Sequence, residues 1–197
     1  MNRTVIMLLW SMIMFNHVMG QEKLKDFRNY PIVLTLHFHS LSMPFKDWKS
    51  VFSNVGIGLG TEVSHNGNNN WVQQLNLVWL KNRGTGSRLS LNTQTSWRPS
   101  LRSDFYSEVK IGVGYMLALR ATKSFQKRGN DWIQVDKRGK SLLVIPVGIG
   151  FGQNNFSNDT YFSPFVGYEF ALLKGYNKSI PVMPQSSIQI GSRVHFD

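Results

Sequence analysis

Hydrophobic and polar residues alternate along most of this chain, which is the pattern of β-strands, because successive side chains of a strand leave on opposite faces. The alternation recurs in eight segments of roughly 9–14 residues, with one longer, whereas strands of globular proteins are commonly about 5–6 residues long and strands that cross a membrane need about 9–11. The pattern therefore predicts an all-β protein with eight strands, near residues 32–40, 53–64, 71–79, 88–98, 108–120, 143–152, 162–172 and 188–196.

The two faces of these strands differ in the size of their side chains. One face carries Gly, Ser, Asn and isolated charges, which fit the narrow interior of an eight-stranded barrel. The other carries Leu, Ile and Val, with large aromatic residues towards the strand ends, as on the lipid-facing side of a membrane barrel. We therefore expect an eight-stranded antiparallel up-and-down transmembrane β-barrel, with a soluble β-sandwich as the alternative; the aromatic residues are Trp71, Trp79, Trp97, Phe151 and Phe170.

The connections between the predicted strands alternate in length. Counted from the strand at 32–40, the odd connections span about 41–52, 82–86, 122–140 and 173–185, and three of these four are long. The even connections, about 65–70, 99–104 and 153–159, are short and rich in Asn, Pro and Ser. Outer-membrane barrels have long external loops and short periplasmic turns. The segment 37–44 has a second interpretation, as an extension before a barrel that begins at Ser53.

The first twenty residues have the pattern of a signal peptide. Arg3 precedes an apolar run over residues 4–15, and Val18 and Gly20 fit a cleavage site before Gln21. An uncleaved anchor is the alternative, but the run is shorter than the roughly 20 residues of a membrane-spanning helix. We expect a signal peptide at 1–20, a short periplasmic segment at 21–31, and one barrel domain at 32–197.

Composition narrows the function classes. The 197 residues include 22 Lys and Arg against 11 Asp and Glu, for a net charge of +11, but only 17% of residues are charged. There is no Cys, which excludes disulfides, thiolate metal sites, a cysteine nucleophile and a lipid anchor on cysteine. A mean hydropathy of −0.21 argues against several helical spans. The positive charge is spread over the chain without a stripe of stacking aromatics, so nucleic acid is not an expected partner.

Several charges fall on the small-residue face and should therefore point into the lumen. A buried charge is costly unless it is paired, so we expect a structural network of ion pairs that fills the lumen; a gated ion path, or a narrow passive channel for small solutes, is the alternative. The predicted network comprises Glu62, Arg88, Glu108, Lys110, Arg120, Glu169 and Arg193.

The connection 122–140 is strongly basic, with only Asp131 and Asp136 as acidic residues. Basic side chains at the membrane surface can bind phosphates of lipopolysaccharide, and a solvated hairpin tip is the alternative. The predicted basic loop comprises Lys123, Lys127, Arg128, Lys137, Arg138 and Lys140.

The histidines do not form a convincing catalytic or metal site. A regular strand places His39 and Ser40 on opposite faces, which disfavours a serine hydrolase, although a lipid A-modifying enzyme is kept as an alternative. His37 and His39 share a face, but two ligands without a carboxylate cluster make a weak metal site. We expect no catalytic residues, no metal and no cofactor.

Three stretches resemble a family of small outer-membrane β-barrel proteins of Bacteroidetes: VFSNVGIGLGTEVSHNGNNNWVQQLNLVWLKN, SEVKIGVGYMLAL and IPVMPQSSIQIGSRVHF. The resemblance covers residues 37–196 and includes an HSxxxPF motif from His39 to Phe45. It implies the barrel fold and an outer-membrane location after export, with outer-membrane lipid and lipopolysaccharide as surroundings and a further outer-membrane protein as a possible partner. It carries no catalytic residues. The last strand is similar to the signal read by the barrel-assembly machinery, through Ile188, Ile190, Val194 and Phe196.

The expected function is therefore structural or accessory, through the loops near 41–52, 122–140 and 173–185.

Overall fold

The computed structural model describes residues 30–44, 46, 48–65, 69–82, 86–102, 104–119, 124–129, 131–135, 139–153, 160–175 and 181–196. The predicted signal peptide at 1–20 lies outside these residues, as does the 21–31 segment apart from its last two residues. None of the helices in the described ranges is long and apolar enough to cross a membrane.

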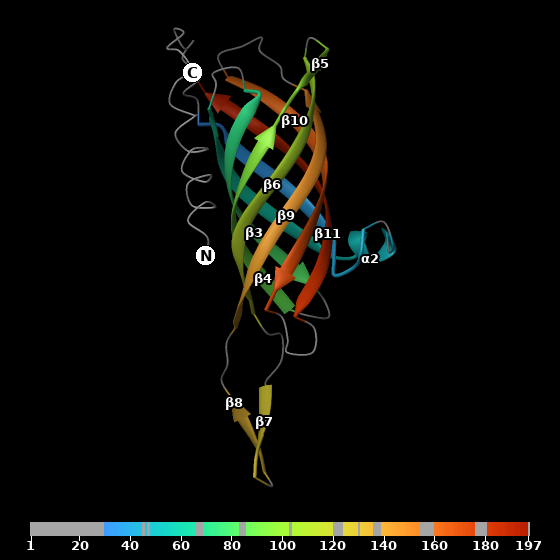
Figure 1. Cartoon of the computed structure of the whole chain (residues 1–197), viewed down its shortest axis with the longest axis vertical. Coiled ribbons are helices and arrows are strands. Elements are labelled where there is room, and N and C mark those ends of the chain that lie inside the picture. Colours follow the sequence, from blue (N-terminus) through green and yellow to red (C-terminus); the bar gives the residue numbers. More distant parts are fainter. Residues whose placement is uncertain are drawn as a thin grey trace, which may run out of the picture.

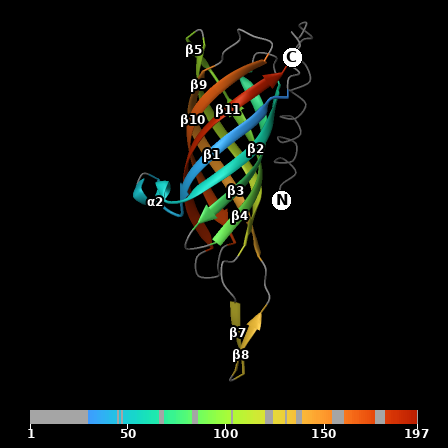
Figure 2. The ribbon, with the colours of Figure 1, turned by 180° about the vertical axis from the view of Figure 1, so that it is seen from behind.

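Eight long strands close into a barrel in the described part of the chain (Figures 1 and 2). Each strand is antiparallel to its neighbours, and the first pairs with the last. The predicted up-and-down barrel is confirmed. Its strands are β1 (Ile32–Ser40), β2 (Val55–Ser64), β3 (Trp71–Asn82), β4 (Gly86–Trp97), β6 (Phe105–Ala118), β9 (Lys140–Gln153), β10 (Thr160–Lys174) and β11 (Val182–Phe196).

The segment 32–40 is a full strand of the barrel. Val33 lies opposite Gly60 on β2 and opposite Arg193 on β11, and the pairing runs along the whole of β1. The interpretation of residues 37–44 as an extension before a barrel that begins at Ser53 is therefore wrong.

The connections lie at two distinct ends of the barrel. The turn end holds the strand ends that flank the connections 65–70, 98–104 and 154–159, together with the start of β1 and the end of β11. The loop end holds the strand ends that flank the connections 41–54, 83–85, 119–139 and 175–181. Residues 83–85 and 154–159 are wholly outside the described residues. The predicted long loop at 173–185 is wrong, because β10 and β11 extend further than alternation indicated. Pro184, which has no N–H to donate to a neighbouring strand, lies within β11 opposite Leu172.

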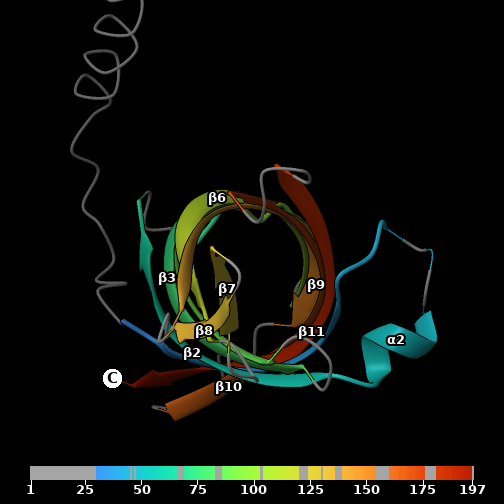
Figure 3. The ribbon, with the colours of Figure 1, turned by 90° about the horizontal axis from the view of Figure 1, so that it is seen from below.

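Three short elements lie in the connections. The strand β5 (Ser100–Arg102) pairs with β6 at the turn end. The helix α2 (Trp48–Phe52) lies beside the barrel wall rather than over its opening (Figure 3), where the Phe52 ring centroid is 5.4 Å from that of Phe38. The strands β7 (Ser124–Arg128) and β8 (Asp131–Val135) form a separate hairpin that extends beyond the loop end (Figure 1).

The outward face of the barrel is apolar and exposed. Tyr115 is 67% exposed and Ile57 65%, although residues of these types are usually buried in soluble proteins. Exposed aromatic side chains gather at the turn end, where Trp71 lies opposite Trp97. The arrangement is inverted relative to a soluble barrel. Outward residues between 37% and 67% exposed include Leu34, Leu36, Ile57, Leu59, Leu75, Leu77, Leu91, Ile111, Val113, Tyr115, Ile145, Val147, Ile149, Val166 and Ile190.

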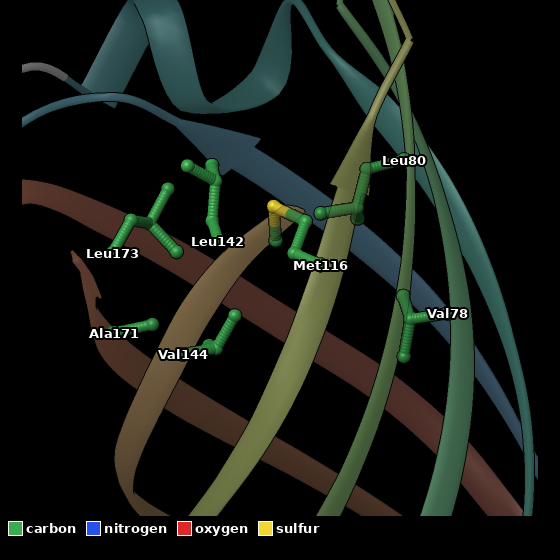
Figure 4. Packing of buried hydrophobic residues seen from close by; sticks show 7 residues of the cluster. All are labelled: Val78, Leu80, Met116, Leu142, Val144, Ala171 and Leu173. Carbon is green, nitrogen blue, oxygen red and sulfur yellow. The ribbon is translucent and has the colours of Figure 1, made fainter. Parts of the chain in front are cut away.

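The lumen is filled with side chains, but it is not polar throughout. At the loop end, an apolar cluster closes it, with Met116 2% exposed and Leu173 fully buried. The sequence pattern predicted a lumen lined by Gly, small polar residues and isolated charges. This is wrong at the loop end, because several strands carry apolar residues on both faces where they approach that end. This apolar plug consists of Val78, Leu80, Met116, Leu142, Val144, Ala171 and Leu173 (Figure 4).

Candidate functional site

A buried charged layer crosses the lumen near the turn end. We define it as Glu62, Arg98, Tyr106, Glu108 and Arg193, contributed by β2, by the residue after β4, by β6 and by β11. Glu62 Oε1 accepts a hydrogen bond from Arg98 Nη2 at 2.6 Å and another from Arg193 Nε at 2.7 Å. One carboxylate is thus held between two guanidinium groups.

The second carboxylate of the charged layer is bound by the same two arginines. Glu108 Oε1 accepts from Arg98 Nε at 2.9 Å, and Glu108 Oε2 lies 3.1 Å from Arg193 Nη2. Ser96 Oγ donates to Glu108 at 2.5 Å, and the Gln74 amide donates to both carboxylates at 2.9 Å. Charges removed from water need this degree of hydrogen bonding to be tolerated.

The Tyr106 ring packs against both guanidinium groups. Its centroid is 5.6 Å from Arg98 Cζ and 5.5 Å from Arg193 Cζ, and its hydroxyl accepts a hydrogen bond from Arg193 Nη1. Arg193 Cζ also lies 4.0 Å from the Phe165 centroid, a cation–π distance. Gly152 faces Tyr106 across the sheet, and a Cβ there would collide with the tyrosine ring. The Gly residues of β9 thus leave room for large side chains inside a narrow barrel.

A second ionic contact lies deeper in the lumen. Lys110 Nζ donates to Gln189 Oε1 at 2.6 Å and is 3.9 Å from Glu169 Oε2, which also accepts from Gln94 Nε2 at 2.8 Å. Gly148 lies opposite Lys110 and leaves space for its methylene groups. Between these residues there is a polar cavity of about 20 Å³, room for about one water molecule.

The seven charges predicted for the lumen separate into different surroundings. Glu62, Glu108 and Arg193 meet in the charged layer, while Lys110 and Glu169 meet in the second contact. Arg88 is buried nearer the loop end, where its Nη1 donates to Gln185 Oε1 at 2.9 Å. Arg120 lies outside the described residues.

Arg98 and Tyr106 were missing from the predicted network. The alternation that places Arg88 and Ser96 on the inner face continues to Arg98, but Arg98 is followed by Pro99 and was assigned to the strand end. Tyr106 precedes the first charge of the predicted strand and carries no formal charge itself. The signal that could have added Arg98 to the predicted network is the alternation of apolar and polar residues, which continues through Trp97 and Arg98.

The predicted basic loop is only partly described. Lys127 and Arg128 lie in β7 and Lys140 is the exposed first residue of β9, whereas Lys123, Lys137 and Arg138 lie outside the described residues. Figures 1 and 3 together place the β7–β8 hairpin beyond the barrel opening, along the line of the lumen. The β7–β8 hairpin is therefore the furthest described part of the loop end from the barrel.

His37, His39 and His195 are buried on the inner side of the barrel wall, whereas His65 is exposed just after the end of β2. His37 shares hydrogen bonds with Thr35 Oγ1 at 2.9 Å and with Ser187 Oγ at 3.4 Å. His39 and Ser40 are both buried, although a regular strand would put them on opposite faces, because the 41–54 connection covers the end of β1: Ser40 Oγ bonds to Ser42 Oγ at 2.5 Å. Within the described ranges, no three His, Asp or Glu side chains gather as a metal site.

The four residues of the predicted assembly signal lie on one side of β11. Ile190 and Phe196 are exposed, and Ile188 and Val194 are half-buried, all at outward positions of the strand.

Comparison with known proteins identifies the barrel by its structure alone. No protein-family model and no curated protein matches the sequence. Neisserial surface protein A is similar in fold, with a TM-score of 0.60 and 12% identity, over 85% of this chain and 97% of that one. The N-terminal barrel domain of Pseudomonas aeruginosa OprF (TM-score 0.46, 8% identity, 83% and 97% covered) and the Yersinia pestis outer membrane protein Ail (TM-score 0.41, 13% identity, 85% and 99% covered) also match. The likeness to Neisserial surface protein A, an outer-membrane β-barrel protein, shows that this chain shares its type of fold.

Proposed function

We propose that this protein is an integral outer-membrane β-barrel with a side-chain-filled lumen, which acts as a structural or accessory component through the connections at its loop end. The observation that carries the proposal is the inverted barrel: its apolar side chains face outward and its charges face inward. Contiguous exposed apolar patches on soluble monomers rarely exceed a few hundred Å², whereas this apolar face extends over all eight strands.

The aromatic residues at the turn end support a membrane boundary there. Trp and Tyr concentrate at membrane–water interfaces because their rings are apolar and their tips polar. The exposed rings at this end come from six barrel positions, namely Trp71, Trp97, Phe105, Phe151, Phe162 and Phe196.

The filled lumen favours a closed barrel rather than a channel. The charged layer crosses the turn end and the apolar plug crosses the loop end, and a cavity of about 20 Å³ lies between them. A catalytic role finds no support either. His37 has a hydrogen-bonded serine, Ser187, and both residues are buried inside the lumen, where a lipid substrate would have no access.

The same proposal assigns an orientation. The turn end faces the periplasm and the loop end faces outward, so the basic connection 119–139 meets the phosphates of lipopolysaccharide. The last strand is recognised by the barrel-assembly machinery after export with cleavage of residues 1–20. Partners among other outer-membrane proteins would bind at the loop end.

Heat-modifiable gel mobility combined with membrane fractionation tests this function. A membrane barrel should be recovered in the outer-membrane fraction after an alkaline wash, and it should migrate as a compact band until it is boiled. A protein recovered only from the soluble periplasm would overturn the proposal.

A further inference from the structure

A polar cluster interrupts the outward apolar face on β3 and β4. Gln73 Nε2 donates to Thr93 Oγ1 at 2.5 Å, and Thr95 Oγ1 donates to Gln73 Oε1 at 2.8 Å. Thr93 Oγ1 donates in turn to the Gln74 carbonyl oxygen at 3.1 Å. All three side chains are half-exposed on the outer surface. We call them the Gln–Thr cluster.

The cluster lies close to the aromatic residues of the turn end. Gln73 is two residues from Trp71, and Thr95 is two residues from Trp97, or about 7 Å along each strand. Polar side chains at this depth are costly on a lipid-facing surface unless their hydrogen bonds are satisfied. The bonds within the cluster use one of the two amide N–H groups of Gln73, so the other can bind an acceptor outside the protein.

An apolar groove begins on the same wall, further from the turn end. It crosses β11 and β1 to β4, on the wall that faces the viewer in Figure 2, is open towards the outside, and has a volume of about 630 Å³. Ligand pockets commonly have volumes of about 300–1,000 Å³. Its lining reaches Leu77 on β3, about 14 Å along the strand from Gln73. The groove is lined by Leu34, Leu36, Ile57, Leu59, Leu77, Trp79, Leu89 and Ile190, with Thr35 and Gly58.

We propose that this wall holds a phospholipid from the turn-side leaflet, with an acyl chain in the groove and an ester or hydroxyl group at the Gln–Thr cluster. The inference rests on the proposed membrane location. Its basis is the order of the two features along β3: hydrogen-bonding groups lie beside the interfacial tryptophans, and apolar lining lies deeper. That order matches an amphiphile whose head is at the interface and whose chain points to the bilayer centre.

A second copy of the chain fits the wall less well. A flat or convex barrel wall would leave the groove as a void in a dimer interface, and voids lose packing contacts. An acyl chain can follow a hollow of this shape, and an ester carbonyl accepts the hydrogen bond that the Gln73 amide can still donate.

Native mass spectrometry of the barrel extracted from outer membranes in mild detergent tests the inference. The wild-type protein should retain one phospholipid. The variant Gln73→Met/Thr93→Val/Thr95→Val removes the hydrogen bonds with little change in volume, and Leu59→Trp fills the groove. Each should lower the retained fraction about three- to tenfold, because the triple variant removes the hydrogen bond from the Gln73 amide to the lipid and Leu59→Trp removes the space for the acyl chain. Ile149→Trp is the matched control, because Ile149 is 53% exposed on β9, across the barrel from Leu59, which is 54% exposed.

The outcomes separate this inference from the proposed function. Each protein is first required to show a heat-modifiable band in the outer-membrane fraction. A folded wild-type barrel that retains no phospholipid, or equal retention by Leu59→Trp and Ile149→Trp, would overturn the lipid site and leave the membrane location intact. A dimer mass that disappears in Leu59→Trp would show that a second copy occupies the groove, which also contradicts the inference.

Discussion

Arg193 holds the charged layer together at the scale of single residues. Its guanidinium contacts both carboxylates and two aromatic rings, and it is 2% exposed. Because the site is closed to water, a carboxylate that loses one of its cations cannot be compensated by solvent.

Arg193→Met should therefore destabilise the barrel strongly. Loss of one partner of a buried ion pair typically costs about 3–5 kcal/mol of unfolding free energy. The measurement is the urea midpoint of the heat-modifiable band in detergent or lipid. Lys174→Met, at an exposed position of β10, is the control and should change the free energy by no more than about 0.5 kcal/mol. Equal midpoints for the two variants would show that the charged layer contributes nothing to stability.

Individual site residues were predictable only where they lie inside a strand with regular alternation of apolar and polar residues. Glu62, Glu108 and Arg193 lie well within their strands, and the period of two places each on the inner face. Their partners depend on barrel closure, which brings β2, β6 and β11 around one lumen, and no local pattern encodes that. Arg98 lies beyond the end of β4, and Tyr106 joins the layer through its ring and hydroxyl rather than through a charge.

At the scale of elements, strands were easier to predict than their ends and connections. Alternation between Leu or Ile and small residues fixes which face points outward, because a slip of one residue would reverse every side chain. It fails where both faces are apolar, as at Leu142 to Pro146 on β9 and Ala171 to Leu173 on β10, and there the apolar plug was missed. The final strand was likewise predicted from Ile188, whereas β11 begins at Val182.

The β7–β8 hairpin forms a sheet of its own and should be dispensable for folding. Replacing residues 120–138 by an Asp-Gly turn should leave the urea midpoint of the barrel unchanged, because such turns join adjacent antiparallel strands without strain. The same change should lower the lipopolysaccharide that copurifies with the protein, because it removes five of the six residues of the basic loop. A destabilised barrel would show that the hairpin supports the fold. Unchanged lipopolysaccharide would show that the basic loop does not bind it.

At the scale of the whole molecule, closure of the sheet ties the two ends of the described chain together, as disulfides do in many small exported proteins. The chain has no Cys, and the pairing of β1 with β11 leaves the barrel sheet without a long unpaired edge. The charged layer and the apolar plug then fill the space that closure creates. The charged residues of the chain thus include paired ones inside the lumen and basic ones in the connection 119–139.

A barrel filled in this way should not conduct ions. Planar bilayers with the wild-type protein should show no reproducible openings, since the lumen is crossed by two separate layers. Met116→Ser/Leu173→Ser should also remain silent, because the charged layer still closes the turn end. Regular single-channel steps from the wild-type protein would contradict a closed lumen and favour the passive channel.

The inverted barrel is tested most directly by a scan of single cysteines along β3. The absence of native Cys allows one cysteine at a time at positions 74–79 in protein reconstituted into lipid vesicles, each carrying an environment-sensitive fluorophore. Outward and inward positions alternate here, with Leu75, Leu77 and Trp79 exposed. We expect a lipid-like emission and quenching by brominated lipid at 75, 77 and 79, and neither at 74, 76 and 78. Water-like emission at the odd positions, without quenching, would contradict a barrel that faces lipid.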